Sequence, residues 1–189
     1  MDREVELRLV AGLKRGEAAA FDAVYDEHRL RLFSFMSRMV GRHDVAEDLT
    51  QEAWMRLAAR AASLREDTRL APWLFTVARN LCVSYWRTHG NEGIGDSTSR
   101  AMDRLRERGA SPERGAESRE LRERLEATLA GLPPRYREVL LLVGVDGMPP
   151  AEAAGICGLT PEAMRKRLER ARDMLAARLE RARSRDGAR

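Results

Sequence analysis

The chain has 189 residues, of which 43% are hydrophobic and 34% charged, a composition typical of a folded, helix-rich protein rather than a disordered one. No apolar run approaches the roughly 18 residues that a membrane-spanning helix needs. The first residues also lack the apolar stretch and cleavage site of a signal peptide. We therefore expect a cytoplasmic protein with no membrane insertion.

The cysteines and histidines are too scattered to suggest a metal site. Cys82 and Cys157 lie far apart in the sequence, and zinc sites are built from closely spaced pairs. We expect no metal ion and no cofactor. Each cysteine lies in an apolar helical stretch, where a thiol usually packs as a small hydrophobe, although a redox role stays open.

The net charge of +4 is unevenly distributed along the chain. Residues 163–189 contain 10 basic and 4 acidic side chains, a net charge of +6 within one short segment. Nine of the ten aromatic residues, in contrast, lie within the first 88 residues. The C-terminal end therefore has the charge of a nucleic-acid-binding surface, and the two halves of the chain have different roles.

The apolar pattern collapses between residues 89 and 118, where Gly, Ser, Pro and charged residues predominate. Such a composition predicts a linker, because about 30 residues without regular structure are unusual inside one domain. We expect an all-α protein with two small helical domains, at residues 1–88 and 119–183, followed by a basic tail at 184–189. No strand-like alternation of β-branched residues is present.

Apolar residues at helical spacing predict four helices in the first domain, at about 5–13, 18–40, 44–64 and 72–88. Gly16 and Gly41 end the first two helices. Asp44 is the expected N-cap of the third, with Glu47 reaching back as in a capping box. Pro72 suits the first turn of the fourth helix.

The second domain has the pattern of a helix-turn-helix protein. A helix marked by Leu121, Leu125 and Leu129 stops before Gly131, and helices at 135–143 and 151–157 follow. Gly158 separates the last of these from a final helix that Thr160 caps. An apolar stripe runs along the final helix, and most of its basic residues lie outside the stripe; the stripe contains Met164, Leu168, Ala171, Leu175 and Leu179.

Four segments occur in an order that is specific to one family. Residues 46–52 (AEDLTQE), 72–81 (PWLFTVARNL), 132–140 (LPPRYREVL) and the basic residues of 165–172 resemble motifs of bacterial RNA polymerase sigma factors of the extracytoplasmic-function (ECF) type. The resemblance implies a region 2-like four-helix domain and a region 4-like helix-turn-helix domain joined by a flexible linker. It also implies a transcription initiation factor that binds core RNA polymerase, directs it to promoters and melts them.

Two positions depart from the family pattern. Met148-Pro149-Pro150 stands where the family usually has a serine followed by an aromatic residue at the start of the first helix of the motif. Glu169 stands on the final helix where a non-acidic residue is common. An acidic side chain facing phosphate would repel DNA, whereas one facing a cytosine amino group could accept a hydrogen bond.

An acidic and amide-bearing patch marks the third helix. The resemblance assigns core-polymerase binding to Asp48, Leu49, Gln51 and Glu52. Independently of the resemblance, an acidic patch on a DNA-binding protein repels DNA and is suited to a basic protein partner. The same residues could instead form an ordinary solvated helix face.

The fourth helix combines hydrogen-bond donors with flat rings, the groups that hold single-stranded bases. The predicted contacts with the minus-ten element are Arg79, Asn80, Tyr85, Trp86 and Arg87. For Trp73 we favour core packing, whereas for Asn80 and Trp86 we favour contact with bases. The turn at residues 65–71 resembles the loop with which the family captures a flipped base.

The final helix is the predicted reader of the minus-thirty-five element in duplex DNA. Its candidate contacts are Thr160, Arg165, Lys166, Arg167 and Arg170, near the end of the helix that normally reaches bases. A solvated basic face without sequence readout is the other interpretation.

Two further functions are compatible with parts of the sequence. A stand-alone helix-turn-helix regulator would leave the acidic patch and the aromatic fourth helix without a role, and a sigma mimic that titrates an anti-sigma protein would not need the basic final helix. An enzyme is not indicated, because the sequence has no paired nucleophile and base, metal cluster or phosphate-binding glycine loop. The expected partners are core RNA polymerase, promoter DNA and an anti-sigma protein, with no small-molecule substrate.

Overall fold

The computed structural model describes residues 1–89 and 116–186, and within them all regular structure is helical. The all-α prediction is confirmed. The predicted linker at 89–118 falls almost entirely outside the described residues. The helices are α1 (Arg3–Lys14), α2 (Ala18–Val40), α3 (His43–Arg60), α4 (Leu70–His89), α6 (Ala116–Ala130), α7 (Pro134–Leu140), α8 (Pro150–Cys157) and α9 (Pro161–Asp186).

Most helix ends lie where the sequence predicts them. Gly41 and Gly158 adopt left-handed conformations, with φ of 72° and 64°, and end α2 and α8. Thr160 caps α9, since its hydroxyl accepts a hydrogen bond of 3.2 Å from the amide of Ala163. The Asp44 cap is wrong: α3 begins at His43, and the Asp44 carboxylate instead pairs with Arg42. An arginine two residues earlier takes up the oxygens that would otherwise cap the helix.

The first domain consists of α1 to α4, and α2 supplies the centre of its core. Leu32, Phe35 and Met36 are fully buried, and the ring of Phe35 meets Phe75 of α4 edge to face at 5.3 Å. In the second domain a short π-helical segment (Leu141–Val145) extends α7, contacts α2 and α8, and buries Leu141 and Leu142. Because Met164, Leu168 and Ala171 are also buried, the predicted stripe of α9 faces this core over its first half.

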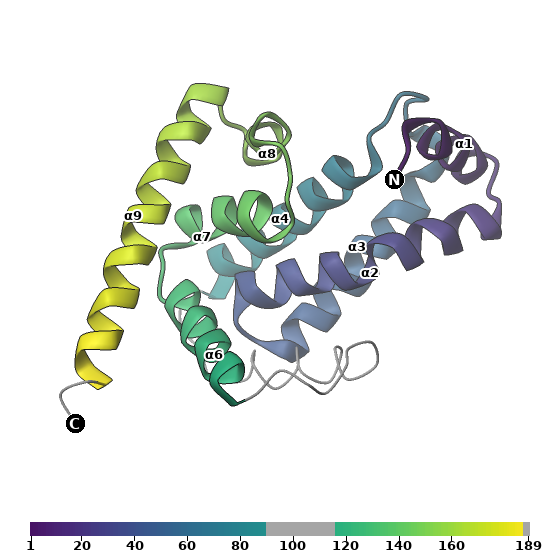
Figure 1. Ribbon diagram of the computed structural model, residues 1–189. Helices are drawn as coiled ribbons and strands as arrows, with labels where there is room; N and C mark the ends of the chain where they lie inside the picture. Colours follow the sequence, from purple (N-terminus) through teal and green to yellow (C-terminus); the bar gives the residue numbers. More distant parts are fainter. Residues whose placement is uncertain (90–115, 187–189) are drawn as a thin grey trace.

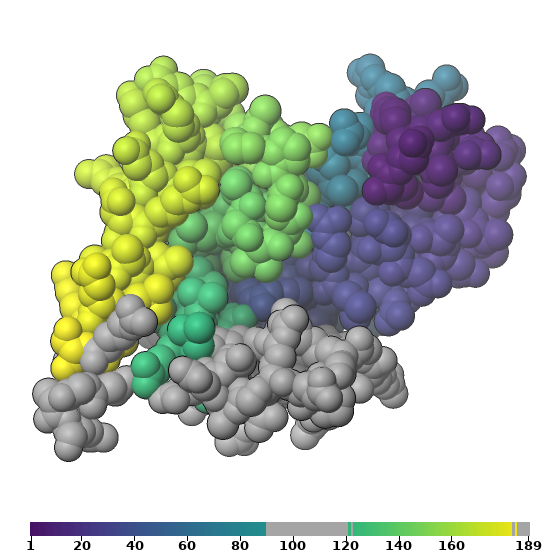
Figure 2. Space-filling view, in the orientation of Figure 1, coloured from purple at the N-terminus to yellow at the C-terminus, as the bar shows by residue number. Residues whose placement is uncertain are grey.

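The two domains lie side by side, with α4 against α8 and the second half of α2 against α6 and α7 (Figure 1). Polar contacts cross this boundary. Arg137, which is fully buried, donates to the carbonyl oxygen of Met39 at 2.8 Å and also to three carbonyls around the end of α6. One guanidinium thereby satisfies the free carbonyls at the ends of two helices, one in each domain. In the space-filling view α9 forms the outer edge of the second domain (Figure 2).

Candidate nucleic-acid and polymerase-binding surfaces

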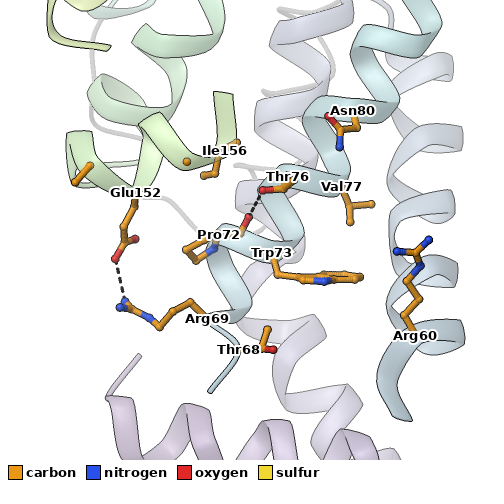
Figure 3. Close-up of a pocket in the computed structure, with 12 residues that line it drawn as sticks. Arg60, Thr68, Arg69, Pro72, Trp73, Thr76, Val77, Asn80, Glu152 and Ile156 are labelled. Atoms are coloured by element: carbon orange, nitrogen blue, oxygen red, sulfur yellow. Dashed lines mark hydrogen bonds and ion pairs between the residues drawn. The ribbon is translucent and has the colours of Figure 1, made fainter. Parts of the chain in front are cut away.

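A pocket of about 580 Å³ lies at the start of α4, where the first domain meets α8. Trp73, Val77 and Asn80 line it from one side of α4 because residues three or four apart share a helix face, and Arg60 at the end of α3 faces them (Figure 3). Thr68 of the preceding turn completes this side. The opposite wall comes from the second domain, and it contains Ala151, Glu152, Gly155 and Ile156.

One ion pair spans the mouth of this pocket. Arg69 Nη2 lies 3.1 Å from Glu152 Oε1 and so joins the turn before α4 to α8 (Figure 3). Both side chains keep contact with water, with 54% and 28% of their surfaces exposed. The pocket thus combines an aromatic ring, an amide and two guanidinium groups, which can stack on and hydrogen-bond to a flat polar ligand such as a nucleobase.

The other predicted minus-ten residues differ in accessibility. Arg87 is exposed, whereas Tyr85 and Trp86 are half-buried and pack against the core. The ring of Tyr85 also stacks on His89 at 4.5 Å. Of the five candidates, Asn80 is the one that lines the pocket.

Arg79 faces a buried carboxylate of the second domain. Its Nε donates to Glu138 Oε2 at 2.8 Å, and the other oxygen of Glu138 accepts from Arg167 of α9 at 3.3 Å. Burial lowers the pKa of Arg79, but the hydrogen bond and charge of Glu138 outweigh burial and leave the pKa above its ordinary value. A single carboxylate therefore holds one candidate residue from each of the two helices that are predicted to contact DNA.

The remaining candidates on α9 are open to solvent. Arg165 and Arg170 are exposed, and so is Lys166, which pairs with Glu162 one turn earlier at 2.8 Å. Thr160 is exposed and caps the helix. The basic face at the start of α9 is therefore free to meet duplex DNA, with Arg167 as the exception. Glu169 is exposed on the same helix.

The acidic patch on α3 is also accessible. Asp48 and Gln51 are exposed, Glu52 is half-buried and pairs with Arg56 at 2.8 Å, and Leu49 packs partly against the core. These four residues therefore form one continuous helix surface, with Leu49 at the edge that faces the core.

Sequence reasoning missed two features of these surfaces. Trp73 packs against the core, as the sequence predicts, but its ring also lines the pocket beside Asn80, which the sequence reasoning missed. Their spacing of seven residues, two helical turns, was the available signal. Nothing in the sequence indicated that Glu138 would meet Arg79, because the contact joins residues 59 positions apart in different domains.

The cysteines lie away from solvent, and the described residues contain no cluster of three or more potential metal ligands. Burial raises the pKa of Cys82 well above its usual range and that of Cys157 to about 12. Both thiols therefore stay protonated at neutral pH, which disfavours redox reactivity.

Comparison with known families accounts for both domains. A family model of Sigma-70 region 2 matches residues 24–92, and one of Sigma-70 region 4 matches residues 122–175. The ECF RNA polymerase sigma factor EcfG of Rhodopseudomonas palustris is 34% identical over 146 residues, which cover 77% of each chain. The chain belongs to the ECF sigma factors. ECF sigma factor SigW of Bacillus subtilis is similar over 88% of this chain and 92% of its own length, with 26% identity.

Solved structures agree with this assignment. CnrH, solved in complex with the cytosolic domain of CnrY, superposes with a TM-score of 0.69 and 25% identity over 93% of this sigma factor and 97% of CnrH. The sigma factor RpoE of Bartonella quintana, solved with the anti-sigma factor NepR, gives a TM-score of 0.62 and 27% identity over 82% and 95% of the two chains.

This ECF sigma factor is a transcription initiation factor, and neither the stand-alone regulator nor the sigma mimic is favoured. Among the helices of the described residues, none is long and apolar enough to cross a bilayer.

Proposed function

We propose that this sigma factor captures an unstacked base of the minus-ten element in the pocket at the start of α4. The supporting observation is the composition of the first-domain wall, where the Trp73 ring, the Asn80 amide and the Arg60 guanidinium surround one hollow. Stacking on an aromatic ring and hydrogen bonds to the base edge are the two interactions that hold a flipped base. Arg79, Tyr85, Trp86 and Arg87 would contact the neighbouring DNA further along α4.

Core-polymerase binding is proposed for the α3 surface formed by Asp48, Leu49, Gln51 and Glu52. An exposed acidic patch flanked by a half-buried leucine suits a basic protein surface with an apolar contact beside it. Reversing Asp48 and Glu52 to Arg should abolish co-purification with core enzyme. The matched control reverses Glu4 and Asp173, two exposed acids on α1 and α9, and should bind as the wild type does. Equal binding by both double variants would exclude the α3 surface.

The minus-thirty-five element is proposed to bind along the first turns of α9. The exposed Arg165 and Arg170 can read base edges, Lys166 can anchor phosphate, and Thr160 holds the end of the helix that enters the groove. Arg167 can join them only if it leaves Glu138.

An anti-sigma protein is the proposed regulator, since two similar structures were solved as complexes of a sigma factor with a partner protein. We propose that the factor acts in the cytoplasm, where core polymerase and promoter DNA are present. Its role there is binding and positioning rather than catalysis.

Variants of the pocket residues test directly whether the pocket contributes to promoter melting. In reconstituted holoenzyme, Asn80→Ala and Trp73→Ala should leave polymerase binding intact and reduce the permanganate reactivity of promoter thymines. Loss of one stacked base corresponds to about 1 to 3 kcal/mol. Ser84→Ala, on an exposed position one turn further along α4, is the control and should melt promoters normally. Wild-type reactivity in both pocket variants would contradict base capture at this site.

A further inference from the structure

The N-terminal helix α1 contacts the turn that forms part of the pocket, although α1 lies outside the residues that the region 2 family model matches. Glu6 of α1 is only 5% exposed, which is unusual for a carboxylate in the first turn of a terminal helix. Its side chain points away from solvent and towards the start of α4. A buried carboxylate persists only where it is hydrogen-bonded or paired.

The first partner of Glu6 is the free end of α4. Glu6 Oε1 accepts a hydrogen bond of 2.8 Å from the backbone amide of Leu70, the first residue of that helix. The residue before the helix is Arg69, whose side chain carries no acceptor and cannot cap. Glu6, which lies on another helix, therefore caps the N-terminus of α4 in place of an N-cap residue. Its negative charge also interacts favourably with the positive end of the helix dipole.

The other carboxylate oxygen of Glu6 holds the turn that precedes α4. Glu6 Oε2 pairs with Arg3 at 2.7 Å and with Arg69 at 3.2 Å. Arg3 in turn donates to the carbonyl oxygen of Asp67 at 2.8 Å and reaches that of Thr68 at 3.5 Å. Two side chains of α1 thus hold the backbone of residues 67–70 and the guanidinium of Arg69.

Close packing of α1 against α2 holds the side chains of α1 in position for these contacts. A Cβ atom at Gly12 would lie 2.7 Å from Cβ of Ala20, so the absence of a side chain lets α1 approach α2 closely. Asp2 caps α1 by accepting from the amide of Glu4 at 2.8 Å.

We infer that Arg3 and Glu6 are positioning residues for base selection: α1 fixes the turn so that Thr68 and Arg69 face the base in the pocket at a set distance from Trp73 and Asn80. Selectivity between bases depends on hydrogen-bond geometry at the base edge, so a loose turn would weaken preference for one base over another. The inference rests on the proposed base capture, and it identifies the residues that determine which base the pocket prefers.

The test measures base preference rather than activity alone. Holoenzyme containing full-length sigma factor is mixed with fork-junction DNAs whose single-stranded positions are randomised, and the bound molecules are sequenced. Glu6→Gln keeps an oxygen for the Leu70 amide but loses the charge that holds both arginines. Arg3→Ala releases the turn without altering the cap. Both should lower the preference at the captured position by about fivefold, the scale of one net hydrogen bond.

Matched controls come from the same helix. Glu4→Gln and Arg8→Ala make the same chemical changes at exposed positions and should keep the wild-type preference. A merely structural role for Arg3 and Glu6 would reduce the active fraction of protein but leave the ratio between bases unchanged. Wild-type preference in both Glu6→Gln and Arg3→Ala overturns the inference.

Failure of the proposed function gives a different result. If Asn80→Ala and Trp73→Ala keep the wild-type base preference, the pocket does not select bases, and the inference falls with it. If the pocket variants lose preference while the α1 variants keep it, base capture stands and only the role of α1 is wrong.

Discussion

The two helices that carry the candidate DNA contacts differ in how accessible they are. On α9 the side chains of Arg165, Lys166 and Arg170 project into solvent, whereas on α4 Arg79 is 21% exposed and paired with Glu138. The pocket beside Asn80 has one wall made by α8 of the second domain. The α9 surface is therefore accessible in this arrangement, whereas α8 covers one side of the α4 surface. If the proposed function is correct, the α4 surface becomes fully open only when the domains move apart.

The proposed contacts with both promoter elements require the same movement. Elements centred 25 base pairs apart are separated by about 85 Å of duplex at about 3.4 Å per base pair. A compact chain of 189 residues has a radius of gyration of about 16 Å and so spans only about half that distance. The side-by-side domains cannot touch both elements at once.

The ion pairs that join the domains share one polarity. Among the described residues, each ion pair between the domains joins an arginine of the first domain to a carboxylate of the second: Arg31–Asp146, Arg38–Glu126, Arg69–Glu152 and Arg79–Glu138. Carboxylates bind guanidinium groups much as phosphates do. The second domain thus pairs with arginines of the first domain that other anions could otherwise contact. The variants Arg38→Ala, Asp146→Asn and Glu152→Gln each alter one of these pairs.

The largest effect is expected at the Arg38–Glu126 pair. Arg38 is buried and Glu126 is mostly so, with 6% and 14% of their side chains exposed and several contacts between 2.7 and 3.0 Å. Arg38→Ala leaves the Glu126 charge without its partner and should lower the free energy of unfolding by about 3 kcal/mol. Arg56→Ala removes the exposed pair with Glu52 and should cost less than about 1 kcal/mol. Urea unfolding compares them, and equal losses would contradict a buried interdomain pair.

A stabilising change is expected at Asp146. Burial raises the pKa of its carboxyl from 3.8 to about 6, although Arg31 and Arg38 act in the opposite direction. The folded protein therefore binds this proton more tightly than the unfolded chain, so stability falls as pH rises from about 4 to about 6. Asp146→Asn removes the buried charge and keeps the backbone carbonyl that accepts from Arg31 at 2.8 Å.

The free energy of unfolding of Asp146→Asn should exceed that of the wild type by up to about 3 kcal/mol at pH 7.5 and by little near pH 4. This difference corresponds to the shift of about two units in the pKa of Asp146. Thermal unfolding at both pH values measures the difference. A variant that is less stable than the wild type at pH 7.5 would show that the charged pair with Arg31 outweighs the cost of burial.

Local features of the fold could be predicted from the sequence because they depend on neighbouring residues. Apolar spacing gave α2 its correct limits, and the glycines at 41 and 158 ended their helices because few other residues adopt positive φ. The cap at Asp44 failed where an adjacent arginine competed for the carboxylate.

Features that depend on the docking of helices could not be predicted in this way. Arg137 lies within a motif that the sequence matched to the family, yet its burial between the ends of α2 and α6 follows from interdomain packing. The same holds for Glu6, whose partners Leu70 and Arg69 lie more than 60 positions away. From residue type alone, both Arg137 and Glu6 would be expected at the surface.

A difference within α9 is expected between Arg165 and Arg167. Arg165→Ala should lose preference at one base pair of the minus-thirty-five element, worth about 1 to 3 kcal/mol for a bidentate contact with guanine. Arg167→Ala should instead lower stability, because its guanidinium binds the buried Glu138. Lys166→Ala should weaken binding to every sequence and reduce the salt slope by about one unit.

Binding to a duplex promoter library, together with unfolding curves, separates these three effects. If Arg167→Ala relaxes base preference while keeping full stability, Arg167 leaves Glu138 to read DNA. If all three variants weaken binding uniformly, α9 is an electrostatic anchor rather than a reader.

The smallest effect is expected at Glu152, whose half-exposed carboxylate pairs with Arg69 across the pocket. A pair of this kind contributes less than about 1 kcal/mol, so Glu152→Gln should favour the open pocket by less than about fivefold. Binding of a labelled single-stranded minus-ten oligonucleotide to the free sigma factor should tighten by that factor. Glu162→Gln, which breaks the comparable pair with Lys166 on α9, should leave this binding unchanged. In holoenzyme whose second domain is bound to a duplex that carries only the minus-thirty-five element, we expect the domains to be apart and the pocket to be empty, so Glu152→Gln should then bind the oligonucleotide as the wild type does. An equal gain in free protein and in holoenzyme would mean that Glu152 repels DNA directly, whereas a gain confined to the free protein identifies α8 as the cover of the pocket.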